Sequence, residues 1–157
     1  MHRFFKDEDG VALVEFAVAL PMMLVVFAVI IEGSRLMLAY QSTIAGVRDA
    51  TRYLSRVLPA DICASGGSVG TYTTQLTAIV GQSVSGRSVL PSAVTLNSVT
   101  PSFACVTGTY RVSPAAVATV SASITVTYPF SGIFGLIGGS VPTVTTSVAD
   151  SARVFGS

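Results

Sequence analysis

The sequence is poor in the side chains on which most catalytic sites depend. It has no tryptophan, and its one histidine and one lysine, His2 and Lys6, lie close to the N-terminus. Beyond residue 58 the acidic residues are Asp61 and Asp150, so a Ser-His-Asp site, a histidine-ligated metal or a lysine Schiff base cannot be built there. Asp61 and Asp150 could still form a catalytic pair of carboxylates. However, we expect Asp61 in a turn and Asp150 on the solvent face of a strand. We therefore expect no enzymatic activity, no cofactor and no metal.

Charged residues are also scarce. They make up 11% of the chain, against about 25% in ordinary soluble domains, while 50% of the residues are hydrophobic. Between residues 62 and 149 the charges are Arg87 and Arg111 alone. With a net charge of +1 the chain has no basic surplus for a nucleic acid, and we expect no such partner. A length of 157 residues leaves room for one modest domain.

The hydrophobic excess is concentrated in residues 11–31, where Glu15 and Pro21 are the interruptions. About 20 apolar residues in a helix cross the hydrocarbon of a bilayer. A core helix of this length would need a larger domain, and the apolar part of a signal peptide is usually shorter. The segment is therefore predicted to be a transmembrane helix. Pro21 removes a backbone donor inside it, so we expect a kink near residues 17–21.

Residues 32–58 continue the helical pattern as a stalk. Arg48, Arg52 and Arg56 form a series at i, i+4 spacing on one face, and Pro59 ends the pattern. Span and stalk are therefore predicted to form one continuous helix, roughly 70 Å long. A second face carries residues at steps of three or four: Leu36, Tyr40, Ile44, Val47, Thr51, Leu54 and Leu58.

After Pro59 the composition changes to Ser, Thr, Val, Ala and Gly. Residues 69–80 have helical spacing, with Ser68 as the expected N-cap and Gly81 as the expected stop. Residues 119–128 alternate between apolar and hydroxyl side chains, which is typical of a half-buried antiparallel strand. We expect an α+β fold: a long N-terminal helix, then a small antiparallel sheet of three to five strands with one short helix. Weaker strand signals lie at residues 93–99, 103–107 and 143–154.

The segment Phe130–Gly139 is apolar and uncharged, but it is too short and too rich in glycine to cross a membrane. It fits a loop or a single helical turn that closes the core over the sheet. It also fits an exposed apolar patch that meets a partner or the membrane surface.

Cys63 and Cys105 are the only cysteines. An isolated pair in a small exported domain is typical of a disulfide, which would stabilise the domain by about 4 kcal/mol in the chain-entropy model. Two buried free thiols are the alternative. A disulfide favours a location of the domain outside the cytoplasm. The positive-inside rule favours the opposite orientation, because Arg3 and Lys6 precede the span whereas the stalk that follows it carries four arginines: Arg35, Arg48, Arg52 and Arg56.

The start of the span combines two unusual positions. Gly10 is the last residue before the apolar run, and Glu15 is the only charge within it. A carboxylate in a membrane helix is costly unless it is paired or near the interface, and Glu15 could simply complement the positive end of the helix. If a peptidase cuts after Gly10, however, Val11 acquires a free α-amine. Glu15 could then pair with that amine on a neighbouring copy.

This combination resembles the TadE-like family, pilin-like proteins of the tight-adherence (Tad) branch of type IV pilus systems. The departure is Val11, where many type IV pilins have Phe. The resemblance implies a pilin-like fold in which residues 1–10 are a cleaved leader, 11–31 the transmembrane helix, 32–58 the helical stalk and 59–157 an extracytoplasmic α+β domain. It is strong over residues 10–58 and rests on Asp7–Ala17, Leu20–Pro21, Glu32–Arg35 and Arg48–Tyr53.

The resemblance also implies a function and a location. A prepilin peptidase would cut after Gly10, and the mature chain would act as a minor pilin or pseudopilin in assembly of an adhesive pilus. It would span the bacterial inner membrane once, with its C-terminal domain in the periplasm, or enter the extracellular pilus. Its partners would be the peptidase, other pilin subunits through the N-terminal helix, the inner-membrane assembly platform and the lipid bilayer. The alternatives are an uncleaved membrane-anchored binding or scaffold module in the periplasm, and a pseudopilin of a type II secretion machine.

Overall fold

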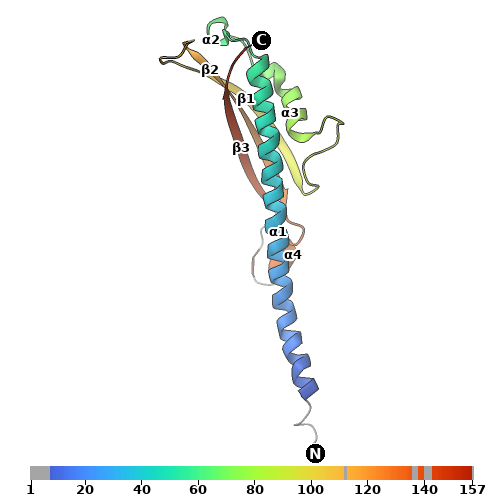
Figure 1. The fold of residues 1–157 in the computed structure, drawn as a ribbon. Coiled ribbons are helices and arrows are strands. Elements are labelled where there is room, and N and C mark those ends of the chain that lie inside the picture. The colour runs from blue at the N-terminus through green and yellow to red at the C-terminus, as the bar shows by residue number, and fades with distance from the viewer. Residues whose placement is uncertain (1–7, 112, 136–137, 140–142, 157) are drawn as a thin grey trace, which may run out of the picture.

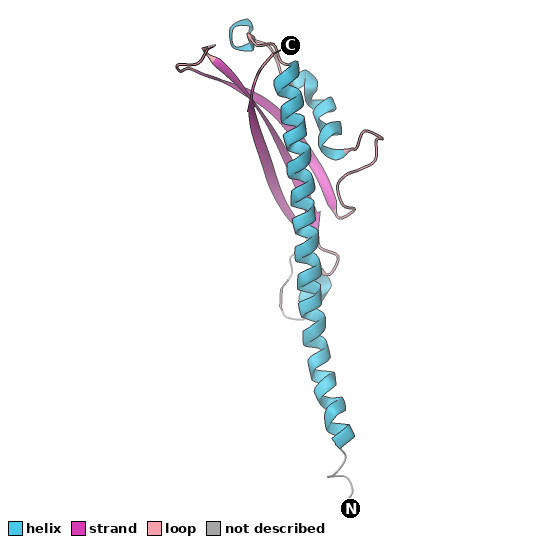
Figure 2. Ribbon diagram, viewed as in Figure 1, coloured by secondary structure: helices cyan, strands magenta, loops and turns pink. Residues whose placement is uncertain are grey.

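The computed structural model describes residues 8–111, 113–135, 138–139 and 143–156. The fold is α+β, as predicted: one long helix lies along a three-stranded antiparallel sheet, with shorter helices around it (Figures 1 and 2). In chain order the elements are α1 (Glu8–Val57), α2 (Ile62–Ser65), the 3₁₀ helix η2 (Gly70–Tyr72), α3 (Thr73–Gly81), β1 (Val94–Val106), β2 (Ala115–Thr127), α4 (Ser131–Gly135) and β3 (Thr143–Arg153).

The helix α1 confirms the prediction of a continuous span and stalk. Its 50 residues run through Pro21 without a break and end just before Pro59. The C-terminal part of α1 packs on the sheet and on α3, while the N-terminal part extends away from the domain (Figure 1). Glu15 and Pro21 both belong to the extended part.

The sheet has the order β1-β2-β3, so the strand with the clearest alternation, β2, is central. Its inward-facing apolar side chains, among them Val120 and Ile124, are fully buried beneath α1. The opposite face carries serine and threonine hydroxyls. These bond to one another across the strands, as Thr119 does with Ser151 at 2.8 Å. The predicted half-buried strand is thus confirmed.

The strand β1 corrects one expectation. Residues 93–99 and 103–107 are not separate strands but parts of one strand, Val94–Val106, that runs through Pro101. Proline lacks a backbone donor and is tolerated in sheets on edge strands. Because β1 is an edge strand, Pro101 can pair with Val120 of β2 without interrupting the ladder.

The predicted short helix over residues 69–80 is present but divided into η2 and α3, and it ends at Gly81 as expected. The prediction of Ser68 as its N-cap is wrong. The Ser68 Oγ accepts a hydrogen bond from the Gly70 N–H, at 3.3 Å. Because a 3₁₀ turn intervenes, α3 begins after Tyr72 and has no side-chain cap.

The two helices α1 and α3 meet at Gly46. A Cβ atom on Gly46 would lie 2.7 Å from the carbonyl oxygen of Val80, closer than real Cβ contacts allow. The absence of a side chain therefore lets the backbones of α1 and α3 approach. This contact closes one side of a core that contains Leu54, Leu76 and Val80, each fully buried.

Candidate functional site

The N-terminal part of α1 exposes nearly all of its apolar side chains. Leu13 is 71% exposed and Phe16 62%, values expected of charged residues in a soluble protein. An unbroken exposed apolar surface of this size marks contact with a membrane or with other proteins. Within the described residues, α1 is the one helix long and apolar enough to cross a membrane.

The residues predicted for processing lie at the beginning of α1. The Gly10–Val11 bond lies within α1, which the structure describes from Glu8 onward, and Gly10, Val11 and Glu15 are all exposed. In the described part of the chain Glu15 makes no ion pair; the one salt bridge found there joins Asp49 and Arg52, at 3.7 Å.

The stalk packs against the rest of the domain with the apolar face that the sequence predicts. Val47, Thr51, Leu54 and Leu58 are buried, and the remaining predicted members of that face are half-buried. The buried Thr51 hydroxyl bonds to the Val47 carbonyl oxygen at 2.8 Å, so its donor is satisfied within the helix. The predicted arginine series lies on the exposed side of the stalk, as expected.

Sequence reasoning missed a buried carboxylate, Glu32, at the junction of span and stalk. Its side chain is 5% exposed, and its Oε1 accepts a hydrogen bond from the Phe130 N–H at 2.8 Å. Nearby, burial raises the pKa of the Tyr128 hydroxyl above its ordinary value of 10.0, and the charge of Glu32 and the Tyr40 hydroxyl raise it further. No local pattern predicts this contact, because Glu32 and Phe130 are 98 residues apart.

The predicted disulfide is confirmed. Cys63 in α2 is bonded to Cys105 in β1, with an S–S distance of 2.05 Å. The bond ties the segment that follows α1 to the edge of the sheet, and no free cysteine is found among the described residues.

Asp61 and Asp150, the two acidic residues beyond residue 58, lie in different structural environments. Asp61 lies in the turn after α1, as expected. Asp150 does not lie on the solvent face of β3: it pairs with the fully buried Val120, and directly paired residues share a face. Asp150 is therefore half-buried on the side that faces α1, where its carbonyl oxygen lies 3.4 Å from the Thr51 hydroxyl.

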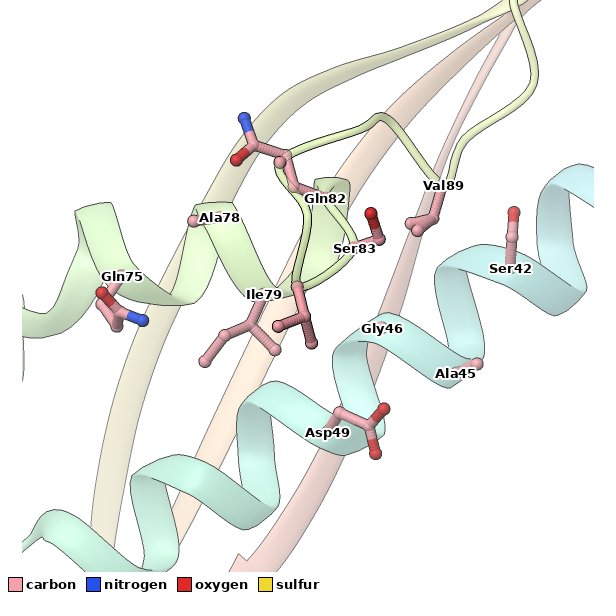
Figure 3. Close-up of a pocket in the computed structure, with 12 residues that line it drawn as sticks. Ser42, Ala45, Gly46, Asp49, Gln75, Ala78, Ile79, Gln82, Ser83 and Val89 are labelled. Atoms are coloured by element: carbon pink, nitrogen blue, oxygen red, sulfur yellow. The ribbon is translucent and has the colours of Figure 1, made fainter.

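An open groove runs between α1, α3 and the loop that follows α3 (Figure 3). Small residues of α1, Ala45 and Gly46, form its floor, with Ile79 on the α3 side. Its one titratable group, Asp49, lies at the rim, 67% exposed. The described residues contain no cluster of potential metal ligands.

The structure defines the class of protein: a small α+β domain is built on the C-terminal part of a long helix, and the N-terminal part of that helix is an exposed apolar rod. The family model described as TadE-like protein matches residues 10–52, which confirms the resemblance seen in the sequence and makes this segment TadE-like. The match covers the apolar rod and most of the stalk, and it indicates a protein associated with the Tad pilus. No curated protein and no solved structure matches the chain.

Proposed function

We propose that this protein is a minor pilin or pseudopilin that takes part in assembly of a Tad-type adhesive pilus. A prepilin peptidase removes residues 1–10, residues 11–31 hold the subunit in the inner membrane, and the domain lies in the periplasm. Its role is structural rather than catalytic. The observation that carries the proposal is the exposed apolar rod at the start of α1, which bears a single carboxylate, Glu15, within the segment matched by the family model.

The position of Glu15 suits a role in the register between subunits. It lies four residues after Val11, about 6 Å along the helix axis. Within a bundle of apolar helices an unpaired carboxylate is costly to bury, and a cationic α-amine on a neighbouring Val11 would offset that cost. Copies displaced along their axes would separate these two charges, so the pairing favours one register.

The proposed cleavage is tested on protein extracted from bacterial membranes. Intact-mass measurement and N-terminal sequencing should find a chain that lacks residues 1–10 and begins at Val11. A chain that retains Met1 would overturn the pilin proposal and favour an uncleaved membrane-anchored module. Labelling of a cysteine introduced at Ser85, by a reagent that does not cross the inner membrane, should place the domain in the periplasm.

The register role is tested by Glu15→Gln. We expect normal membrane insertion and cleavage but a strong loss of pilus output, measured by shearing pili from the cells. The matched control is Glu8→Gln, the same chemical change within the leader, which should leave pilus output unchanged because the mature subunit lacks that residue. Normal piliation of Glu15→Gln would contradict the register role.

A further inference from the structure

We propose that the segment Tyr128–Gly135, here called the α4 segment, is a second membrane contact that enters the headgroup region of the leaflet on the domain's side of the bilayer. The proposal requires that residues 11–31 span the bilayer. It is independent of leader cleavage and of which side the domain occupies, so it can fail while the proposed function holds.

The first argument is the depth of the segment along α1. In Figure 1 α4 lies beside α1, on the N-terminal side of the sheet, and the two helices are in contact. Ala28 is 4% exposed and Glu32 5%, whereas Ala17 and Ala19 are exposed on the same helix. The Phe130 N–H donates a hydrogen bond to the Glu32 carboxylate at 2.8 Å, so the α4 segment lies against α1 at Glu32. Glu32 directly follows Ile31, the last residue of the predicted span.

The second argument is chemical. The chain has no charged side chain between Arg111 and Asp150, so every residue of the α4 segment is uncharged. It contains Phe130, Ile133 and Phe134 together with Tyr128, and tyrosine is enriched where the membrane meets water. The α4 segment lies beside the end of the predicted span and is uncharged. We therefore expect the side of the segment that faces away from α1 to contact lipid rather than water.

The third argument concerns the backbone. Hydrocarbon contains no water, so backbone polar groups near it need partners within the protein. A helix as short as α4 satisfies few of its own donors. The Glu32 carboxylate accepts the Phe130 N–H, and the Tyr128 carbonyl oxygen accepts the Ser131 N–H at 3.2 Å. Glu32 thus holds the α4 segment against α1 while it removes an unpaired donor from the interface.

The test uses the full chain in phosphatidylcholine–phosphatidylglycerol vesicles, with a spin label on a cysteine at Gly132. This position is exposed, and a Cβ there meets no atom within 4 Å. Collision rates with oxygen, which concentrates in lipid, and with a water-soluble nickel chelate report the depth of the label. Val29→Cys in the span and Ser85→Cys in the loop after α3 provide the lipid and water references.

We expect the Gly132 label to collide more with oxygen than with nickel chelate, with a ratio closer to that of Val29 than to that of Ser85. A ratio equal to that of Ser85 would overturn the proposal. Protection from both reagents would also overturn it, because the segment would then be covered by another protein chain.

A second measurement tests the role of Glu32. Glu32→Ala should raise the nickel collision rate at Gly132 several-fold, whereas Glu32→Gln, which keeps an acceptor oxygen, should change it little. The Ser85 label and the mass of the disulfide-bonded chain verify that the domain stays folded. An unchanged rate in folded Glu32→Ala would show that Glu32 does not hold the segment.

Discussion

The two parts of α1 are continuous in backbone and opposite in surroundings. Ala17 and Ala19, in the N-terminal part, are exposed, whereas Ala39 and Ala50, in the C-terminal part, are completely buried. Apart from Glu15, the N-terminal part is apolar around its whole circumference, which suits a nonpolar solvent or a bundle of similar helices. The C-terminal part is amphipathic, with a buried face and exposed arginines. The domain therefore covers the apolar side chains of the C-terminal part only. The apolar side chains of the N-terminal part need a lipid bilayer or other helices to cover them.

The border between the two parts is a short stretch around Glu32–Tyr40. Glu32 contacts the backbone before α4, and the Tyr40 hydroxyl donates to the Thr146 hydroxyl at 2.9 Å. These are the first polar side-chain contacts between α1 and the rest of the described chain when α1 is followed from its N-terminus. Beyond them, α1 is an integral part of the domain.

The largest difference between the two parts should appear on truncation of leucine. Leu54 is completely buried, so Leu54→Ala should lower the free energy of unfolding by about 2–5 kcal/mol, through lost burial and the cavity left behind. Leu13→Ala, in the exposed part, should leave the unfolding of the domain unchanged. Urea denaturation of the full chain in detergent micelles measures both. Equal losses would refute the division of α1 into two parts.

A smaller difference separates two glycines of α1. Gly46→Ala should destabilise the domain by about 1–3 kcal/mol, because the new Cβ would overlap the Val80 carbonyl oxygen. A Cβ atom on Gly33 would meet no atom within 4 Å, so Gly33→Ala should be neutral or slightly stabilising through helix propensity. Thermal unfolding of both variants in the same detergent gives the comparison. A stabilising Gly46→Ala would mean that α1 and α3 do not meet closely at this point.

Tyr40→Phe sharpens the location of the border. It removes the hydroxyl that bonds to Thr146 and should lower the free energy of unfolding by about 0.5–1.5 kcal/mol. The control Tyr110→Phe changes a tyrosine that is 49% exposed and should have little effect. Urea denaturation detects the difference, and the same result for both variants would place the border of the domain beyond Tyr40.

The smallest effect concerns pH. The pKa of Tyr128 is raised in the folded state, first by burial and then by Glu32 and Tyr40. The neutral hydroxyl is therefore favoured by folding: its contribution to stability is complete below pH 10.0 and is lost as pH rises through the higher folded-state pKa. Absorbance at alkaline pH should show a tyrosine that ionises late, and Tyr128→Phe should remove that late transition.

Much of the fold follows from local patterns. The length of α1, its end before Pro59, the alternation of β2 and the stop at Gly81 are all set by the spacing of apolar residues and by breakers in the same segment. The Cys63–Cys105 pairing was also predictable, because the chain contains just two cysteines. The proposals for Gly10 and Val11 as a processing site and for Glu15 as a register residue also come from local pattern, because their signal lies within a few neighbouring residues.

The failures share a different cause. Local pattern cannot show that β1 is an edge strand, and this position is what lets Pro101 stay within it. Nor can it show that Asp150 pairs with the buried Val120 and so turns toward α1 rather than to solvent. Each outcome depends on which strands become neighbours and in which register.

The amino-acid sequence by itself determined the elements of this protein: an apolar rod with a single carboxylate, an amphipathic stalk and strands that alternate between apolar and hydroxyl residues. Tertiary structure alone decided which distant groups meet, including Gly46 with Val80 and Glu32 with the backbone of Phe130. The physical reason is that periodicity acts over a few residues, whereas these contacts arise only when the chain has folded back along its own helix.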